Sequence, residues 1–309
     1  MTNRWQTRWS LVAISLLLFG GLPTLTGQPL DRPLTVLLVP SDGGTEDGTR
    51  ADFAPLFAAL TRQTGYAFKI RVGQSYAAVI EAMANQQADL AYFGTVSFLT
   101  ARERGPVELL AISVIDGGFF YYSGFFTRAD SGITSLSDLA GRSLILSDPR
   151  SSSGFVYPLA WLEKSALDPL RDPARIILSG SHANTLTALA EGRGDVAAAP
   201  FESYVRAVRN GVIDPRTIRI VAKSDPIPNP PIAVNATLPP EVRTTLRQAL
   251  DEIHRAPGVE PGMIRGHAGK IVDRYEADVE DALFDLARTN MALIDDAYRA
   301  AVLAKAGER

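Results

Sequence analysis

Three consecutive serines and a glycine, at residues 151–154, have the residue types and the spacing of an anion-binding turn. They follow an apolar run at 143–146 that is typical of a buried strand, and they precede a helical pattern over 155–167. The start of a helix presents free backbone N–H groups and the positive end of the helix dipole, and hydroxyl groups add donors. The segment therefore predicts a site for an anion that needs no lysine or arginine. The alternative is that Ser152 or Ser153 serves only as the N-cap of the helix.

Two ring-bearing polar residues, Tyr76 and His182, each open a predicted helix. In both stretches an aspartate follows thirteen residues later, Asp89 or Asp195, at the start of a strand of small residues. This internal repeat predicts one structural unit that is used twice, with the first residue of each helix directed toward a common ligand. Two alternatives stay open: helices of α/β proteins often look alike, and His182 could be a simple capping residue.

One carboxylate is placed where it could reach the same ligand. Glu202 follows a predicted strand, and the carboxyl ends of parallel strands face the ligand cleft. There it could accept a hydrogen bond from an oxyanion or pair with an amine; the alternative is a solvated glutamate at a helix start, which the helix dipole favours. The other two histidines, His254 and His267, are interpreted as surface residues.

The chain offers no recognisable catalytic or metal-binding motif. It contains no cysteine, no histidine pair at helical spacing and no carboxylate cluster at ligand spacing. Phosphate-binding loops, dinucleotide-binding glycine motifs and nucleophile elbows are also absent from the sequence. We therefore expect no metal, no cofactor and no catalytic residues. A net charge of -3 without a basic patch argues against nucleic acid as a partner.

The N-terminus has the layout of a secretory signal peptide. Arg4 and Arg8 precede an apolar run at 9–19, and small, turn-forming residues follow as far as Gly27. Residues 1–27 are therefore predicted to be a signal peptide; a retained anchor is the alternative, although the apolar run is short for one. Without cysteine the chain cannot carry disulfides or a cysteine-linked lipid. We expect a periplasmic protein that is soluble after cleavage and is not a cysteine-anchored lipoprotein.

Strand and helix patterns alternate along most of the chain, which predicts an α/β protein with parallel sheets. The polar stretch at 41–50 is predicted to be a loop. The alternation breaks at an aromatic segment, residues 117–126, and a second segment, 226–231, contains four prolines and must be extended. Both are interpreted as crossings between two lobes. The predicted division is a first lobe at 34–120, a second lobe at 121–226, a return to the first lobe at 227–275 and a C-terminal helical segment at 276–309.

These stretches together resemble the periplasmic phosphonate- and phosphite-binding proteins of ABC transporters, the PhnD-like family. The matching segments are 76–83, 88–94, 148–154 with Pro158, 179–182, 194–198 and 226–232, which keep the order of the family. The resemblance implies a type II periplasmic-binding fold. In that fold two α/β lobes, each a mixed, mainly parallel sheet flanked by helices, enclose a ligand cleft.

The resemblance also implies roles for individual residues. The three serines, Ser151 and its two successors, would hold the phosphonate oxygens with the helix N-terminus, helped by Tyr76 and His182. Ser152 replaces a threonine that is frequent in the family motif and keeps the hydroxyl group. Glu202 matches an acid that contacts the far end of an aminoalkylphosphonate.

Two departures from the family pattern bear on the ligand. Phe93 stands where some members have a ligand-contacting tyrosine, so one hydroxyl group is missing. Pro230 stands where aminoethylphosphonate binders can carry a second acid. The sequence therefore favours a smaller ligand, such as phosphite, methylphosphonate or phosphate.

The expected function is that of an exported solute-binding protein of an ABC importer. It would close two lobes over a small phosphorus oxyanion and deliver it to a permease in the membrane. The alternatives are a sulfonate- or sulfate-binding protein, which uses the same chemistry, and the ligand-sensing component of a signalling system. An enzyme is not expected.

Overall fold

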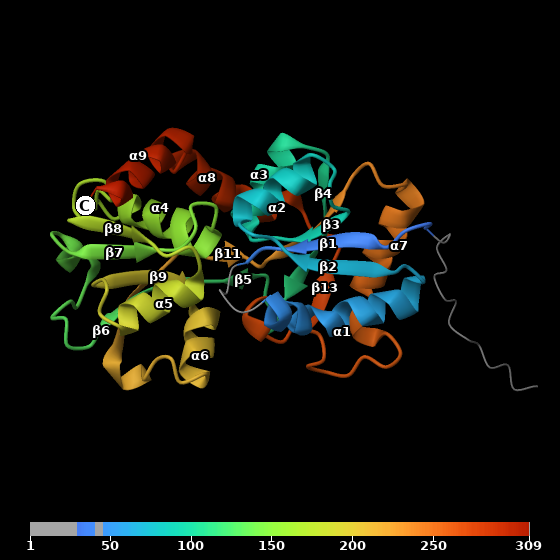
Figure 1. Cartoon of the computed structure of the whole chain (residues 1–309), viewed down its shortest axis with the longest axis horizontal. Coiled ribbons are helices and arrows are strands. Elements are labelled where there is room, and N and C mark those ends of the chain that lie inside the picture. The colour runs from blue at the N-terminus through green and yellow to red at the C-terminus, as the bar shows by residue number, and fades with distance from the viewer. Residues whose placement is uncertain (1–29, 41–45, 309) are drawn as a thin grey trace, which may run out of the picture.

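The computed structural model describes residues 30–40 and 46–308, so the predicted signal peptide lies outside the described residues. Two α/β units dominate the fold (Figure 1). The first contains β1 (Leu34–Leu38), α1 (Glu46–Thr64), β2 (Phe68–Val72), α2 (Tyr76–Ala84), β3 (Leu90–Tyr92), α3 (Thr95–Arg104), β4 (Val107–Val114), β12 (Pro231–Asn235), α7 (Pro240–Asp251) and β13 (Arg274–Glu276). The second contains β6 (Ser123–Arg128), β7 (Ser143–Leu146), α4 (Tyr157–Lys164), β8 (Arg175–Leu178), α5 (His182–Ala190), β9 (Val196–Pro200), α6 (Phe201–Arg209) and β10 (Ile218–Lys223).

The remaining elements connect or cover these units. They are the short strands β5 (Phe120–Tyr121) and β11 (Ile227–Pro228), the C-terminal helices α8 (Asp285–Leu293) and α9 (Asp296–Gly307), the π-helical turn η2 (Ser152–Val156), and the 3-10 turns η1 (Leu136–Leu139), η3 (Pro215–Thr217), η4 (Ile253–Arg255), η5 (His267–Gly269) and η6 (Asp281–Phe284). Within the described ranges, no helix has the length and apolar character that a membrane crossing requires.

Both large sheets are mixed: three parallel strands form one edge of each sheet, and the other strands are added antiparallel. The first unit has six strands in the order β13-β4-β12-β3-β1-β2, and the second has five in the order β10-β6-β9-β7-β8. We call them the six-stranded and the five-stranded unit. In the first, β1 pairs in parallel with β2 and β3; in the second, β7 pairs in parallel with β8 and β9. Helices cover the faces of each sheet (Figure 1), as buried parallel strands require.

Helix α1 begins earlier than the sequence pattern predicts. Phe53, Leu56, Phe57 and Leu60 are buried at the expected helical spacing, and Gly65 (φ +76°) follows the helix end. The prediction of a loop through residue 50 is wrong from Glu46 onward, however, because the helix begins there. Glu46 and the next residue place negative charge in its first turn, where the helix dipole stabilises it.

The two crossings between the units lie side by side. The aromatic segment contains β5, the proline-rich segment contains β11, and the two strands pair antiparallel with Tyr121 opposite Ile227. The Asn229 side chain donates to the carbonyls of Ser113 and Gly118, at 2.9 and 3.0 Å, which fixes the second crossing to the first. Both crossings predicted from the sequence are therefore present, and they pair with each other in one antiparallel ribbon, which we call the crossing ribbon.

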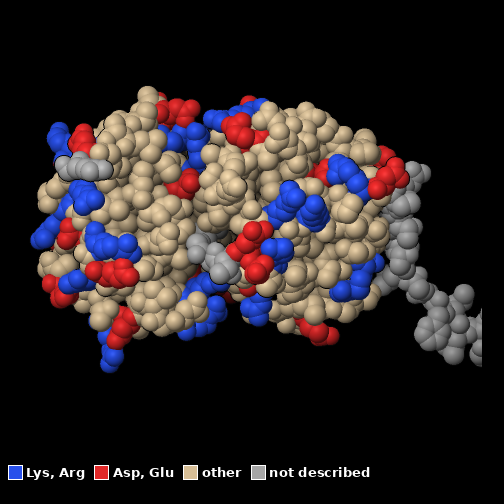
Figure 2. Space-filling model, in the orientation of Figure 1, with Lys and Arg blue, Asp and Glu red and all other residues tan. Residues whose placement is uncertain are grey.

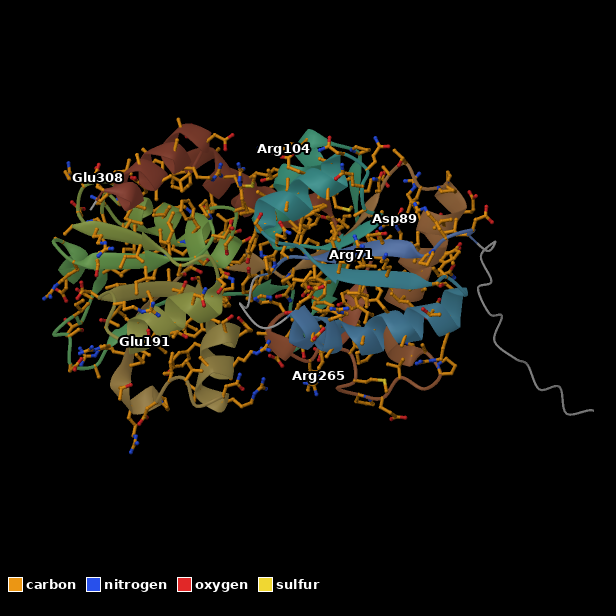
Figure 3. All side chains as sticks on the ribbon, in the orientation of Figure 1. Arg71, Asp89, Arg104, Glu191, Arg265 and Glu308 are labelled. Carbon is orange, nitrogen blue, oxygen red and sulfur yellow. The ribbon has the colours of Figure 1, made fainter. Side chains whose placement is uncertain are left out.

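The internal repeat is present in the structure down to individual hydrogen bonds. Asp89 precedes β3 and accepts the backbone N–H of Thr35 in β1 at 2.7 Å. Asp195 precedes β9 and accepts the backbone N–H and the hydroxyl of Ser143 in β7, at 2.8 and 2.6 Å. Figure 3 labels Asp89 in the six-stranded unit, where it also pairs with Arg32. Each aspartate thus connects the start of the strand that follows it to the start of β1 or β7, the middle strand of the three parallel strands in its sheet.

Replacing Asp195 with alanine should lower the free energy of unfolding by about 1–2 kcal/mol, because two donors of Ser143 lose their acceptor. Burial acts to raise the pKa of Asp195, but the hydrogen bonds from Ser143 outweigh it and hold the pKa below its ordinary value. The carboxylate therefore stabilises the fold above about pH 4, and this contribution is lost as the pH falls below that value. Urea denaturation at pH 7 measures the effect. Asp130→Ala, which removes an exposed carboxylate from a turn, is the control and should change the midpoint little.

The C-terminal helices contact both units. Helix α8 packs against α3 of the six-stranded unit and α4 of the five-stranded unit, and α9 packs against β8. The Phe98 and Phe284 rings lie 5.5 Å apart between their centroids, which extends the apolar core from α3 into the C-terminal segment. On the face that Figure 2 shows, basic and acidic side chains are interspersed among neutral surface.

Candidate oxyanion-binding site

A small cavity of about 20 Å³ lies where the two units meet the crossing ribbon. By volume it suits a group only a few atoms across. Its walls are formed by Val39, Tyr76, Gly94, Tyr121, Ser151, Ser152, Ser153, His182, Pro230 and His267. No lysine or arginine is among these described residues. We call this space the oxyanion cavity. The structure thus brings together five of the six residues that the sequence predicts for the site, and Glu202 lies elsewhere.

Four helix starts meet at the oxyanion cavity. Helices α2 and α5 begin with Tyr76 and His182, and in each the preceding serine accepts a backbone N–H of the first turn. Helix α3 begins directly after Gly94, which provides no side-chain cap. The π-helical turn begins at Ser152. Because each helix start carries partial positive charge and free N–H groups, their convergence makes a field that favours an anion without any formal cation nearby.

The three serines have different hydrogen bonds. Ser151 is the N-cap, because its Oγ accepts the N–H of Gly154 at 3.0 Å, so the assignment of that role to Ser152 or Ser153 is wrong. The Ser152 Oγ accepts the N–H of Val96 at 2.9 Å, across the junction between the units. The Ser153 carbonyl accepts the Ser123 hydroxyl at 2.6 Å. Residues 151–154, which we call the cradle, are therefore held from both sides.

Comparison with known proteins shows the family of the chain. The family model for the periplasmic phosphonate substrate-binding protein of ABC transporters matches residues 44–290. The chain belongs to this family. It is 29% identical over 276 residues to the phosphate-import protein PhnD of Mycolicibacterium smegmatis, an alignment that covers 84% of this chain and 85% of that protein.

Solved structures establish the type II periplasmic-binding fold. A binding protein of a phosphonate ABC transporter from Pseudomonas aeruginosa superposes with a TM-score of 0.74 at 24% identity, covering 89% of this chain and 94% of the other. PhnD1 from Prochlorococcus marinus, solved with methylphosphonate, superposes with a TM-score of 0.69 at 17% identity, covering 84% and 97%. The α/β fold predicted from the sequence is confirmed.

Tyr121 is a wall of the oxyanion cavity that the sequence pattern does not single out. Its side chain is partly buried, and desolvation raises the pKa of its phenol; hydrogen bonding to Ser153 opposes that shift, and the charge of Glu202 adds to it. The phenol therefore stays protonated at neutral pH and keeps its proton for donation. Phe93, where the family resemblance implied a missing hydroxyl group, is fully buried in the core and lies outside the residues that form the cavity walls.

His267 also lines the oxyanion cavity, so its interpretation as a surface residue is wrong. Its ring stands edge-on to that of His182, with centroids 5.6 Å apart and an interplanar angle of 85°. The turn η5 reaches the cavity because the His267 N–H donates to the Tyr92 hydroxyl at 3.3 Å, which anchors it to β3. His182 thus comes from the five-stranded unit, and His267 comes from a turn that is attached to the six-stranded unit.

Glu202 lies in a neighbouring cavity of about 570 Å³ between α6 and the η5 segment. Its Oε1 is 3.7 Å from the ammonium group of Lys270, which also pairs with Asp116 at 2.9 Å. Its carboxylate therefore already faces a cation from the other unit. The role that the family resemblance implies for Glu202, contact with the far end of an aminoalkylphosphonate, would have to compete with this pairing.

Proposed function

We propose that this chain is an exported binding protein that captures a small phosphorus oxyanion in the oxyanion cavity and delivers it to an ABC permease. The convergence of four helix starts on a cavity without lysine or arginine carries the proposal, because this arrangement stabilises negative charge through fixed dipoles. One relative is named a phosphate-import protein, and one structural neighbour is solved with methylphosphonate.

In this proposal the cradle serines Ser151, Ser152 and Ser153 donate to the oxyanion together with Tyr76 and His182. Tyr121 and His267, which share the same walls, complete the set of donors. Residues 34–120 and 227–275 form one closing lobe and residues 121–226 the other. The chain itself catalyses no reaction, because the ligand leaves unchanged.

The small size of the cavity and the pairing of Glu202 with Lys270 favour a ligand without an aminoalkyl group. Phosphite, phosphate and methylphosphonate meet this requirement. Aminoethylphosphonate would bring an ammonium group that competes with Lys270 for one carboxylate.

A thermal-shift screen of the protein without residues 1–27 tests the proposal. The probes are phosphite, phosphate, methylphosphonate, aminoethylphosphonate, sulfate and taurine, and a ligand that binds the native state raises the melting temperature by mass action. We expect a shift with one of the first three that exceeds the shift with aminoethylphosphonate. Shifts confined to sulfate or taurine would assign the protein to sulfur oxyanions instead, and no shift with any probe would contradict the proposed ligand class.

A further inference from the structure

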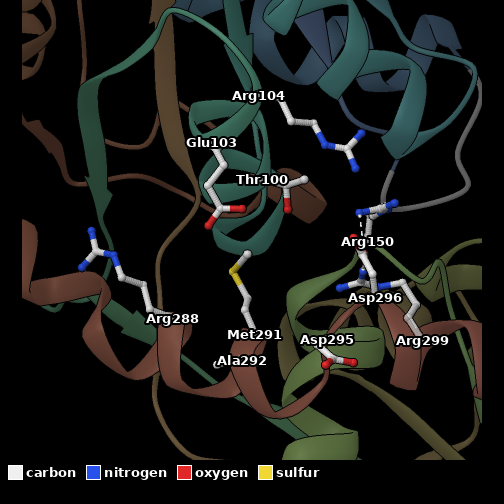
Figure 4. A pocket seen from close by; sticks show the side chains of 10 residues that line it. All are labelled: Thr100, Glu103, Arg104, Arg150, Arg288, Met291, Ala292, Asp295, Asp296 and Arg299. Atoms are coloured by element: carbon white, nitrogen blue, oxygen red, sulfur yellow. Dashed lines mark hydrogen bonds and ion pairs between the residues drawn. The ribbon is translucent and has the colours of Figure 1, made fainter.

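A separate cavity of about 350 Å³ lies where α3, the segment before the cradle, α8 and α9 meet (Figure 4). It shares no lining residue with the oxyanion cavity. Four of its lining residues are arginines, and three of these come from three different elements and lie together: Arg104 ends α3, Arg150 directly precedes the cradle, and Arg299 belongs to α9. Figure 4 shows their guanidinium groups gathered on one side of this space, which we call the arginine cavity.

Within the cavity, the carboxylates that pair with these three arginines do not neutralise all of their positive charge. Arg104 pairs with Glu81 of α2, which is not among the lining residues. Arg150 and Arg299 share one carboxylate, that of Asp296: the Arg150 Nη1 is 3.8 Å from it, and Arg299 contacts it directly. The Asp296 side chain is 78% exposed, so water screens much of its charge.

Other charged residues at the arginine cavity are engaged or lie apart. The Asp295 carboxylate caps α9 by accepting the N–H of Tyr298 at 2.8 Å. Arg288 pairs with Asp281 and Asp285, and Figure 4 shows it and Glu103 on the opposite side of the view from the three arginines. Among the described lining residues, the three gathered guanidinium groups therefore face two carboxylates, those of Asp296 and of Asp295, and the second of these is already engaged as the helix cap.

Arg299 is the most deeply buried of the three arginines, with only 8% of its side chain exposed. Its Nε donates to the Pro149 carbonyl at 3.2 Å and one Nη donates to the Ile294 carbonyl at 3.3 Å, so its plane is held in place. Burial lowers the pKa of Arg299, and the nearby charge of Arg150 lowers it further, while Asp296 opposes both. An additional anion between these groups would relieve that repulsion.

We propose that the arginine cavity is a second anion site that takes a compact, multivalent oxyanion of the phosphate or sulfate type. Planar guanidinium groups bind such ions through paired N–H donors, and the volume of the cavity is sufficient for a small polyatomic ion. The site differs in chemistry from the oxyanion cavity, since formal cations replace helix starts and hydroxyl groups.

Isothermal titration calorimetry with pyrophosphate tests this site on the protein without residues 1–27. The variants are Arg104→Gln and Arg150→Gln, each of which should weaken pyrophosphate binding about tenfold by removing a charge-assisted contact. The matched control is Arg102→Gln, which removes an arginine of similar exposure from the same helix outside the cavity. Methylphosphonate, titrated in parallel, should bind Arg104→Gln as it binds the unmodified protein.

The outcomes separate this site from the proposed function. A loss of pyrophosphate affinity in both cavity variants, but not in Arg102→Gln, supports the second site whether or not methylphosphonate binds. Absence of pyrophosphate binding to the unmodified protein, equal binding to all variants, or an equal loss in Arg102→Gln would overturn it. A loss of methylphosphonate and pyrophosphate binding together in Arg104→Gln would also overturn it, because the two cavities would then not be independent.

Discussion

Gly154→Ala should abolish measurable oxyanion binding and lower the free energy of unfolding by about 1–3 kcal/mol. A Cβ atom at this position would lie 1.8 Å from the Ser147 Oγ and 2.9 Å from the His182 Cε1. Ser147 is only 1% exposed and cannot turn its hydroxyl into solvent, so the cradle or the His182 ring must move. Either movement displaces donors from the oxyanion cavity. Calorimetric titration with phosphate and methylphosphonate measures the first effect, and urea denaturation the second.

The control for this substitution is Gly118→Ala. There the nearest atom to an added Cβ is the Ile115 carbonyl oxygen at 3.7 Å, an ordinary contact, and the residue needs no left-handed backbone conformation. We expect Gly118→Ala to bind as the unmodified protein does. Unchanged binding by a folded Gly154→Ala variant would mean that the cradle and His182 do not define the ligand site.

The sequence predicts the site residues that begin helices, because that position has a local signature. Tyr76 and His182 each follow a capping serine and precede a helical pattern, and the serines of the cradle stand between a strand and a helix. Such boundaries depend on the few residues around them. The same holds for Asp89 and Asp195, whose spacing in the repeat reflects the length of one helix and one turn.

The walls that the sequence does not predict depend on contacts between distant parts of the chain. Tyr121 reaches the oxyanion cavity because β5 pairs with β11, more than a hundred residues later, and one aromatic residue among several gives no sign of this. His267 reaches it through the bond of its N–H to Tyr92. The backbone N–H of Val96, which holds Ser152 from behind the cavity walls, has no side-chain signature in the sequence. Local sequence patterns therefore do not predict site residues that are positioned by strand pairing over long distances in the chain or by backbone N–H donors.

The extent of helix was also only partly predictable. Helix α1 includes Glu46 and Gly48, although glycine and polar residues favour a loop, because the buried face from Phe53 onward stabilises the whole helix. At the cradle the helix predicted from residue 155 instead begins with a π-helical turn at Ser152. That turn lets the Val156 N–H donate to the Ser151 carbonyl at 3.1 Å while the serines face the cavity.

Ser152→Ala should weaken oxyanion binding by about 10- to 100-fold, since a hydrogen bond to a charged group contributes about 1.5–3 kcal/mol. The Ser152 Oγ already accepts the Val96 N–H, so its own hydrogen is available to donate to a ligand. The hydroxyl also bridges α3 of the six-stranded unit to the cradle of the five-stranded unit. Its removal should therefore act mainly by accelerating ligand release, because a bond that holds the closed arrangement is lost.

Two further variants make this prediction specific to the hydroxyl group. Ser152→Thr keeps the hydroxyl and should bind within a few-fold of the unmodified protein, whereas Ser137→Ala, at an exposed serine outside the site, should have no effect. Stopped-flow measurement of release distinguishes the cause of a weaker affinity. If Ser152→Ala slowed association and left release unchanged, the hydroxyl would act on the entry of the ligand, and the bond to Val96 would have no part in holding the units closed. Because one oxygen atom serves both the ligand and the junction between the units, we expect faster release. The bound oxyanion would then be retained by the same contact that closes the protein over it.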